Sequence, residues 1–304
     1  AIADITEGNL GGNGWMGRIR GQLGQQRTLG LITFRNPYLN DSLTSMQIDV
    51  YRSMTNYVTY FEKKGGASLT FGRWLSEYVS GSISLVAEQL NFTDPNGTCA
   101  ASPTLFVCQQ LGDQTTTGFR TSLARDTRDY YLDPRTGTRT SVGFDFGTPY
   151  LGGTNNFYKY YLDAVKYTPL PFDTRFALRG RFGEAKGLND KPVPLTELFF
   201  VGGINTMRGF VFGRAGPVDP VTGSLLGAAK ELIFNNDFIF TISQEAKLNG
   251  VIFFDYGKGF GADESLSFNL RSAAGIEGRW ISPFGPLRAA YGGNLNPPGG
   301  ERKG

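Results

Sequence analysis

The chain has 304 residues, a net charge of +3 and no histidine. A net charge this small gives weak electrostatic support for nucleic-acid binding, and without histidine no Ser-His-Asp or Cys-His catalytic arrangement is possible. Paired carboxylates occur, but none lies in a recognisable active-site motif, so we expect no enzyme activity and no cofactor. No run of residues approaches the roughly 18 apolar residues of a membrane-spanning helix.

Apolar and polar residues alternate with a period of two along most of the chain, in pieces of about ten residues. In one piece Phe176 and Leu178 share one face, and Arg175 and Arg179 share the other. The clearest pieces are residues 15–23, 43–51, 79–88, 138–146 and 174–182. Such alternation predicts β-strands with one apolar and one polar face. We count roughly fourteen strands, beginning near residues 1–9 and ending with a last complete strand near 287–291.

A soluble β-sandwich would show the same period, so three further features decide the class. The polar faces carry long charged side chains in mid-strand. Short turns at 11–14, 75–78, 133–137 and 282–286 alternate with long connections at 91–117, 183–229 and 260–269. Aromatic residues gather near strand ends, at Tyr57, Tyr60 and Phe61 and at Phe157, Tyr158, Tyr160 and Tyr161. Together these features predict an all-β fold, a transmembrane antiparallel β-barrel of the outer-membrane kind.

The two ends of the sequence suggest an incomplete barrel. Ala1 begins directly in alternating sequence without a signal peptide, so we expect a mature or trimmed fragment. Residues 292–304 are rich in glycine and proline, so they read as a loop rather than a closing strand. We therefore expect residues 1–304 to be one barrel domain that is incomplete at both ends, with a strand missing before Ala1 and another after Gly304.

The two cysteines, Cys99 and Cys108, lie in one polar loop segment. Their closeness predicts a local disulfide and an oxidising compartment, although two free thiols remain an alternative. A metal site is not expected, because neither histidine nor a third cysteine is available as a ligand.

Residues 183–229 form the longest connection and carry the sequence Phe-Val-Gly-Gly-Ile-Asn-Thr-Met-Arg-Gly-Phe at 200–210. This segment resembles the sixth-loop motif of the Omp85 superfamily, in particular its BamA-type outer-membrane assembly barrels, with Met207 where Val or Ile is usual. Four other segments resemble that family in the same order along the chain: Asn36-Pro-Tyr38, the Asp-Pro-x-x-Gly turn within 128–137, Phe-Asp-x-Gly within 250–257, and the Ser-Pro-x-Gly-Pro hairpin within 272–286.

The resemblance implies a sixteen-stranded barrel preceded by POTRA domains, of which this chain would supply the second to the fifteenth strand. It also implies that residues 183–229 are an extracellular loop that folds into the lumen. There Arg208 would pair with Asp237 and Asp255 on the inner wall, as a guanidinium can bridge two carboxylates. A solvated loop arginine is the alternative. The loop-motif residues singled out are Gly202, Gly203, Met207, Arg208, Gly209 and Phe210.

The three motif glycines are expected to allow tight bends and close approach to the wall, against the alternative of ordinary loop flexibility. No βα unit surrounds them, so they do not form a phosphate-binding loop. A further set of polar-face residues is expected mainly to solvate the lumen rather than to bind substrate: Arg175, Arg179, Arg181, Glu277, Arg279 and Asp145.

By resemblance, the expected function is to fold and insert other outer membrane proteins through a lateral seam in the outer membrane of a Gram-negative bacterium. The expected partners are outer-membrane lipids, unfolded outer membrane protein clients and the periplasmic lipoproteins of a Bam-type complex, but no nucleic acid. Two alternatives stay open: a two-partner secretion pore, which shares the motifs, and a general diffusion porin, which would conduct ions steadily.

Overall fold

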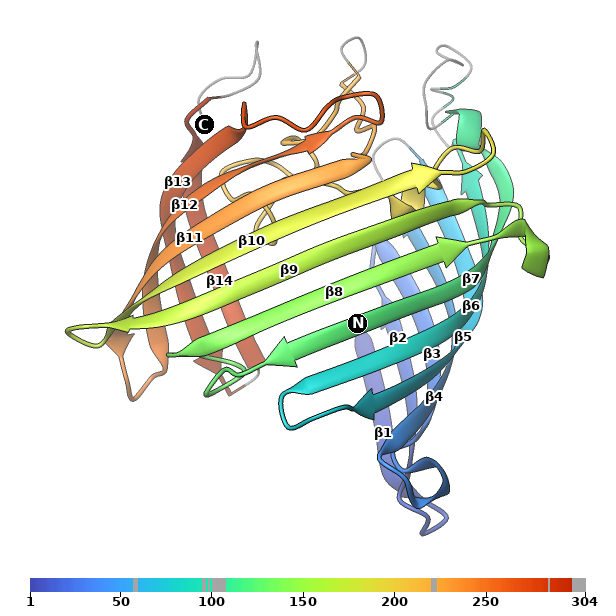
Figure 1. Ribbon diagram of the computed structural model, residues 1–304, viewed down its shortest axis with the longest axis horizontal. Helices are drawn as coiled ribbons and strands as arrows, with labels where there is room; N and C mark the ends of the chain where they lie inside the picture. Colours follow the sequence, from blue (N-terminus) through green and yellow to red (C-terminus); the bar gives the residue numbers. More distant parts are fainter. Residues whose placement is uncertain are drawn as a thin grey trace. The chain divides into compact units, whose positions relative to one another are not determined.

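The computed structural model describes residues 1–56, 60–94, 97, 99, 108–219, 223–283 and 285–296. These residues form an antiparallel sheet of fourteen strands, in which the strand order follows the sequence from β1 to β14 (Figure 1). The strands are β1 Ile2–Leu10, β2 Trp15–Leu23, β3 Arg27–Asn36, β4 Thr44–Asn56, β5 Phe61–Trp74, β6 Val79–Thr93, β7 Gly112–Asp126, β8 Gly137–Gly147, β9 Phe157–Leu170, β10 Thr174–Gly187, β11 Lys230–Ser243, β12 Leu248–Phe260, β13 Arg271–Ser282 and β14 Gly285–Asn294.

Helical structure is confined to single turns in the connections. The short helices are η1 Leu39–Asp41, η2 Cys108–Gln110, η3 Pro149–Leu151 and η4 Leu195–Glu197. In the part of the chain that the structure describes, no helix has the length and apolar character needed to cross a membrane.

The chain divides into two compact units. Unit 1 consists of Ala1–Leu123, Gly143–Lys159 and Lys186–Glu197, and unit 2 consists of Ala124–Val142, Tyr160–Ala185 and Leu198–Gly304. Unit 1 holds all of β1 to β6, and unit 2 holds all of β11 to β14.

In unit 2 the alternation of residue types gives the sheet two chemically different faces. Phe238, Ile252 and Ile276 lie opposite one another on β11, β12 and β13 and are 39%, 54% and 62% exposed. The next residue on two of these strands, Asp237 on β11 and Phe253 on β12, points to the other face and is buried there. An extended apolar face without a protein covering is what a lipid-facing wall requires.

Unit 1 shows the same arrangement. Ile48, Leu69 and Leu85 lie opposite one another on β4, β5 and β6. Glu88 on β6 belongs to the opposite face and is buried. The predicted period of two therefore places apolar side chains outside and charged ones on the packed, polar face in both units.

The strands are longer than predicted, and the connections differ accordingly. The connection between β6 and β7 is 94–111 rather than 91–117, and the longest connection is 188–229 rather than 183–229. The turn predicted at 133–137 is longer and covers 127–136, because Asp129 accepts hydrogen bonds from the backbone of Arg135 and Thr136 and closes a wider loop. Tyr57, one of the predicted end-of-strand aromatics, lies outside the described residues.

Strand β14 corrects the prediction that residues 292–294 are loop, and residues 297–304 lie outside the described part of the chain. It continues to Asn294, with Gly292 opposite Gly275 and Gly293 opposite Ala274. A Cβ atom on Gly292 would lie 2.6 Å from Cζ of Phe253. Gly275 and Gly292 therefore make room for the Phe253 ring, and Gly292 does not mark a turn.

The lipid-facing assignment predicts the cost of a charge on the apolar face. Replacing Ile252 with Lys should lower the free energy of unfolding in a phospholipid bilayer by about 2–4 kcal/mol, because a buried ammonium loses its hydration. The measurement is urea unfolding in vesicles, followed by tryptophan fluorescence. Gln244→Lys in the β11–β12 turn is the control, and equal stabilities of the two variants would show that Ile252 does not face lipid.

Candidate functional site

Within the longest connection, which covers 188–229, residues 202–210 form a compact turn in unit 2. Within it the Gly203 backbone N–H donates to the carbonyl oxygens of Met207 (3.0 Å) and Phe210 (2.8 Å). The hydroxyl of Thr206 accepts from the Gly202 N–H at 2.8 Å and donates to the Gly202 carbonyl at 2.9 Å. These local bonds satisfy the backbone of the turn and hold residues 202–210 in one conformation.

Two of the three motif glycines are required by geometry. Gly202 has φ +133°, and a Cβ atom there would lie 2.3 Å from the Val211 carbonyl oxygen. Gly209 has φ +81°, and its Cβ would lie 2.9 Å from that of Ala273 on β13. Both positions combine a left-handed backbone with close approach to other backbone or wall atoms, which only glycine tolerates.

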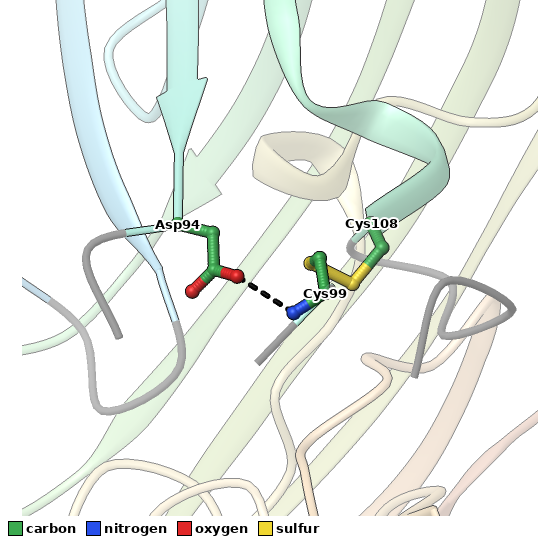
Figure 2. The surroundings of a disulfide bond; sticks show 3 residues. All are labelled: Asp94, Cys99 and Cys108. Atoms are coloured by element: carbon green, nitrogen blue, oxygen red, sulfur yellow. Dashed lines mark hydrogen bonds between the residues drawn. A yellow bond between two sulfur atoms is a disulfide. The ribbon is translucent and has the colours of Figure 1, made fainter. Parts of the chain in front are cut away.

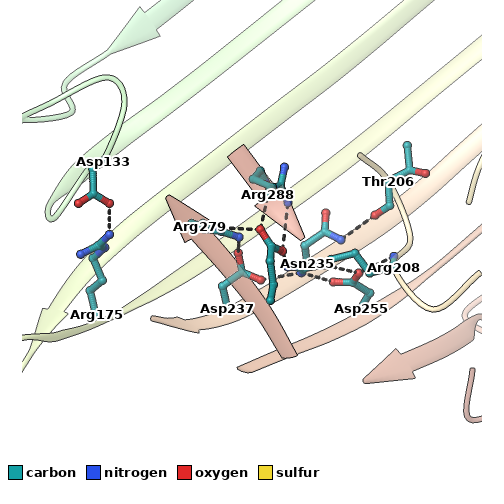
Figure 3. Close-up of polar contacts among 10 residues, drawn as sticks. Asp133, Arg175, Thr206, Arg208, Asn235, Asp237, Asp255, Arg279 and Arg288 are labelled. Atoms are coloured by element: carbon teal, nitrogen blue, oxygen red, sulfur yellow. Dashed lines mark hydrogen bonds and ion pairs between the residues drawn. The ribbon is translucent and has the colours of Figure 1, made fainter. Parts of the chain in front are cut away.

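Arg208 extends from this turn to the polar face of β11, β12 and β13 and is 4% exposed (Figure 3). Its Nε donates to Oδ2 of Asp255 at 2.9 Å and its Nη2 to Oδ1 of the same carboxylate at 2.6 Å. Nη2 also donates to Oδ1 of Asp237 at 2.6 Å, and Nη1 donates to Oε2 of Glu277 at 2.7 Å. The Arg208 backbone N–H adds a fifth bond, 2.8 Å to Asp255.

The strand register explains why three acids surround one guanidinium. Phe253 lies opposite Asp237 on β11 and opposite Gly275 on β13, and Asp255 is two residues further along β12. The Cζ of Arg208 lies 4.0 Å from the centre of the Phe253 ring. Arg208 therefore rests on an aromatic floor, with acids around its edge where its N–H groups point.

Two further arginines from the sheet complete the charge balance. Arg279 donates to Glu277 at 2.7 Å and to Asp237 at 2.6 Å, and Arg288 on β14 donates to Glu277 at 2.6 and 3.1 Å. Three cations thus face three carboxylates. We call the set Arg208, Asp237, Asp255, Glu277, Arg279 and Arg288 the loop-anchor cluster.

The balance of this cluster keeps Arg208 charged although it is buried. Removal from water works against the guanidinium charge, but its hydrogen bond to Asp255 and the charges of Asp237 and Asp255 outweigh that effect, so the pKa of Arg208 lies above its ordinary value. Truncating Arg208 would leave three buried carboxylates with only two cations, which is costly because an uncompensated buried charge is poorly solvated.

The remaining motif residues seat the turn. Met207 and Phe210, 0% and 5% exposed, pack with Val201, Ala215, Ile233 and Ala273 in one apolar cluster. Asn235 on β11 donates from its side chain to the Thr206 carbonyl at 2.8 Å. Gly203 has φ +92°, but the space around it is open to 3.7 Å, so only its backbone conformation favours glycine.

The structure thus brings together every loop-motif residue and both wall acids named from the sequence. Sequence reasoning missed the anchoring roles of Glu277, Arg279 and Arg288. Glu277 and Arg279 were expected mainly to solvate a hydrated interior, yet Glu277 is 3% exposed and accepts from three arginines. Their alternation placed them on the polar face, but nothing in the sequence gives the register between β12 and β13.

The other polar-face arginines also have partners rather than open solvent. Arg175 is 3% exposed and pairs with Asp133 of the 127–136 turn (Figure 3), which also accepts from Asn249 at 3.1 Å. Arg179 and Arg181 both bind Asp163 on β9. In unit 2 these pairs fasten turns and neighbouring strands, so the expectation of simple solvation was incomplete.

Unit 1 contains a second buried ion network, which the sequence did not reveal. Arg120 on β7 donates to Glu88 on β6 at 3.1 and 3.2 Å and to Glu197 of η4 at 3.2 Å. Lys64 lies 3.0 Å from Glu88, and Lys159 lies 3.5 Å from Glu197. Glu197 belongs to the 188–229 connection, so this network holds the start of the connection to the polar face of unit 1.

Backbone contacts support this second anchor. The Gln110 side chain donates to the Val193 carbonyl at 2.9 Å and accepts from the Leu195 N–H at 2.8 Å. The sequence offered no signal for these contacts, because Glu88, Arg120 and Glu197 belong to no common motif.

Asp145, expected to solvate the lumen, is 7% exposed on β8, and its Oδ1 is buried without a hydrogen-bond partner among the described residues.

The two cysteines form a disulfide between Cys99 and Cys108, and the Cys99 N–H donates to Asp94 at 2.6 Å (Figure 2). Among the described residues no group of three metal-ligating side chains is placed to hold a metal ion.

Beside the loop-anchor cluster lies a hollow of ≈ 210 Å³, lined by Thr206, Arg208 and Asn235 among other residues. The site therefore anchors the Arg208 turn to the sheet and leaves a polar hollow beside it.

The sequence of this chain is similar to one protein family over nearly its whole length. Residues 9–304 match the model of the Omp85 superfamily domain. The outer membrane protein assembly factor BamA of Nitratidesulfovibrio vulgaris is 27% identical over 292 residues, which cover 95% of this chain and 36% of that protein. The chain thus spans little more than a third of the length of this relative.

Two solved structures resemble the fold. The structure of BamA from Haemophilus ducreyi lacking POTRA domains 1-3 has a TM-score of 0.84 at 19% identity and covers 100% of this chain and 65% of that chain. CdiB from Acinetobacter baumannii has a TM-score of 0.64 at 14% identity and covers 99% of this chain and 54% of that chain. At these identities the likeness shows a common fold.

The loop-anchor cluster predicts a large difference between two arginine substitutions. Arg208→Ala should lower the free energy of unfolding by about 3–5 kcal/mol, because it leaves buried carboxylates uncompensated. Arg135→Ala, which removes an exposed pair with Asp173, should cost about 0–1 kcal/mol. Arg208→Lys should recover less than half of the loss, since an ammonium lacks the planar fork. Urea unfolding in vesicles measures all three, and equal effects of the two alanine variants would contradict the cluster's role.

The second network predicts a cost for a neutral side chain of the same shape. Glu197→Gln should lower the free energy of unfolding by about 1–3 kcal/mol, because Arg120 and Lys159 lose a buried carboxylate partner. Glu264→Gln removes the partly exposed pair with Lys258 and serves as the control. If both variants unfold at the same urea concentration as the wild type, Glu197 does not anchor the connection.

Proposed function

The chain belongs to the Omp85 superfamily and lies in the bacterial outer membrane, and we propose that it is the membrane-embedded part of a factor that folds and inserts other outer membrane proteins. The observation that carries this proposal is the loop-anchor cluster, in which a buried arginine of the longest connection is fixed by three wall acids. The assembly-factor relative matches nearly the whole chain and supports the same function.

The loop-anchor cluster matters for the proposed function because it fixes the position of the loop. In our proposal residues 198–229 are an extracellular loop that lies inside the lumen, and Arg208 keeps the loop seated there. A seated loop supports the neighbouring strands from within and narrows the path for solutes. A general diffusion porin needs an open path, so the anchored loop favours assembly over passive diffusion.

We propose that clients are recognised through backbone pairing rather than through a chemical step. A client strand that adds to an exposed sheet edge gains main-chain hydrogen bonds whatever its side chains are. Such recognition suits a factor with many different clients. The proposed partners are therefore outer-membrane lipids, unfolded outer membrane proteins and the periplasmic lipoproteins of a Bam-type complex.

A two-partner secretion pore is the second candidate, and it rests on one observation. The chain has the same fold as CdiB over nearly its whole length. The lower TM-score of that match, together with the assembly-factor relative, makes this candidate the weaker of the two.

The test is depletion of the full-length protein in its own host. Depletion should reduce the folded fraction of several unrelated outer membrane barrels together, measured by their altered gel mobility without heating. Re-expression of the wild type should restore them, and re-expression of Arg208→Ala should restore fewer than Arg135→Ala does.

The alternative outcomes are distinct. Loss of one exported protein, while other barrels fold normally, would identify a secretion pore and overturn the assembly proposal. Normal folding of all barrels and normal export after depletion would overturn both candidates.

A further inference from the structure

Strands β4, β5 and β6 of unit 1 carry an apolar band on their lipid-facing side. Three rows of opposed residues make up the band: Met46, Phe71 and Ile83; Ile48, Leu69 and Leu85; and Val50, Ala67 and Ala87. The register holds all three rows level across the three strands. The band therefore ends on one straight line, after the row that contains Val50.

The next two rows on the same side carry two cations and two amides. Arg52 lies opposite Gly65, which lies opposite Gln89; Lys63 lies between Met54 and Asn91. Arg52 and Lys63 are diagonal neighbours across β4 and β5, a spacing of roughly 7–8 Å between backbones. Both side chains are exposed, and no salt bridge to either is found in the part of the chain that the structure describes.

Gly65 forms the floor of a hollow between these side chains. The hollow measures ≈ 380 Å³ and is lined by Arg52, Lys63, Gln89, Asn91 and Asp113, among others. A Cβ atom on Gly65 would meet only the Tyr51 carbonyl oxygen, at 3.8 Å. The position therefore tolerates a side chain, and the space above the glycine is open.

The location of the hollow restricts the class of ligand that can reach it. It lies at the end of the sheet where β4 and β5 are joined and where the long 94–111 connection leaves β6. In outer-membrane barrels the longer connections are extracellular, and lipid-facing cations become tolerable only near the interface with the headgroups. Two cations just beyond an apolar band thus meet the headgroups of the outer leaflet.

We propose that this hollow binds the phosphorylated headgroup of an outer-leaflet lipid. Arg52 and Lys63 neutralise the phosphate, and the amides of Gln89 and Asn91 supply hydrogen-bonding groups for the rest of the headgroup. The acyl chains follow the apolar rows below. Asp113 on β7 also lines the hollow, and its carboxylate accepts a hydrogen bond from Asn91 at 2.7 Å.

The experiment is native mass spectrometry of the full-length protein in detergent, titrated with lipid A as the phosphorylated lipid. Each cation near an anionic headgroup contributes about 5-fold in affinity, so Arg52→Gln with Lys63→Gln should weaken binding about 25-fold. Gly65→Leu keeps both charges but fills the hollow, and it should weaken binding to a similar extent.

The control is Arg73→Gln, an exposed cation on the same side of β5 at the opposite end of the apolar band, opposite Thr44. It should bind lipid A as the wild type does. Inorganic phosphate in large molar excess should not displace the lipid, because the free anion lacks acyl chains to follow the apolar rows.

Three results would overturn the proposal. They are wild-type affinity in the double variant, an equal loss of affinity in Arg73→Gln, or complete displacement by inorganic phosphate. The first means that Arg52 and Lys63 do not bind the headgroup, and the second means that lipid A binds by general charge attraction. The third means that the hollow is a site for free anions. The inference requires only a location in the outer membrane, so its failure would leave the assembly proposal untouched.

Discussion

One buried guanidinium sets the conformation of the longest connection in this chain. Arg208 donates to Asp237, Asp255 and Glu277 on three successive strands, and this requires those strands to keep a fixed register. The turn that carries Arg208 must approach β13 closely, which explains glycine at 209. The floor beneath Arg208 is Phe253, whose ring in turn requires glycine at 275 and 292 on the neighbouring strands.

The cluster is better understood as a device for specificity than as a source of stability. Burying the four charged groups Arg208, Asp237, Asp255 and Glu277 carries a desolvation cost that their mutual attraction offsets only when their hydrogen bonds are satisfied. Here Asp237 and Glu277 are shared between arginines, Asp255 binds Arg208 through three bonds, and the charges balance, so the loop has one well-defined position. The network of Glu88, Arg120 and Glu197 in unit 1 fixes the start of the same connection. The start of the connection is therefore held within unit 1, and its middle is held within unit 2.

Much of this fold follows from local patterns in the sequence. A period of two identified the strands and their faces, and family resemblance supplied Arg208 with Asp237 and Asp255 as its expected partners. The sequence did not reveal Glu277 as a third partner, because that contact depends on the register between β12 and β13. Nor did it reveal Glu197, whose partners on β7 and β9 lie far away in the chain. Gly292 was misread as a loop signal, because room for a ring and freedom for a turn require the same residue.

The most direct test of the central claim is hydrogen exchange of the full-length protein in a bilayer, followed at residues 201–214. If the loop-anchor cluster holds the connection, Asp255→Asn should speed exchange throughout this segment while β11 and β12 stay protected, because the Arg208 side chain and backbone lose their shared carboxylate. Unchanged protection of residues 201–214 in that variant would contradict the account, since the turn would then be held by its own backbone bonds alone.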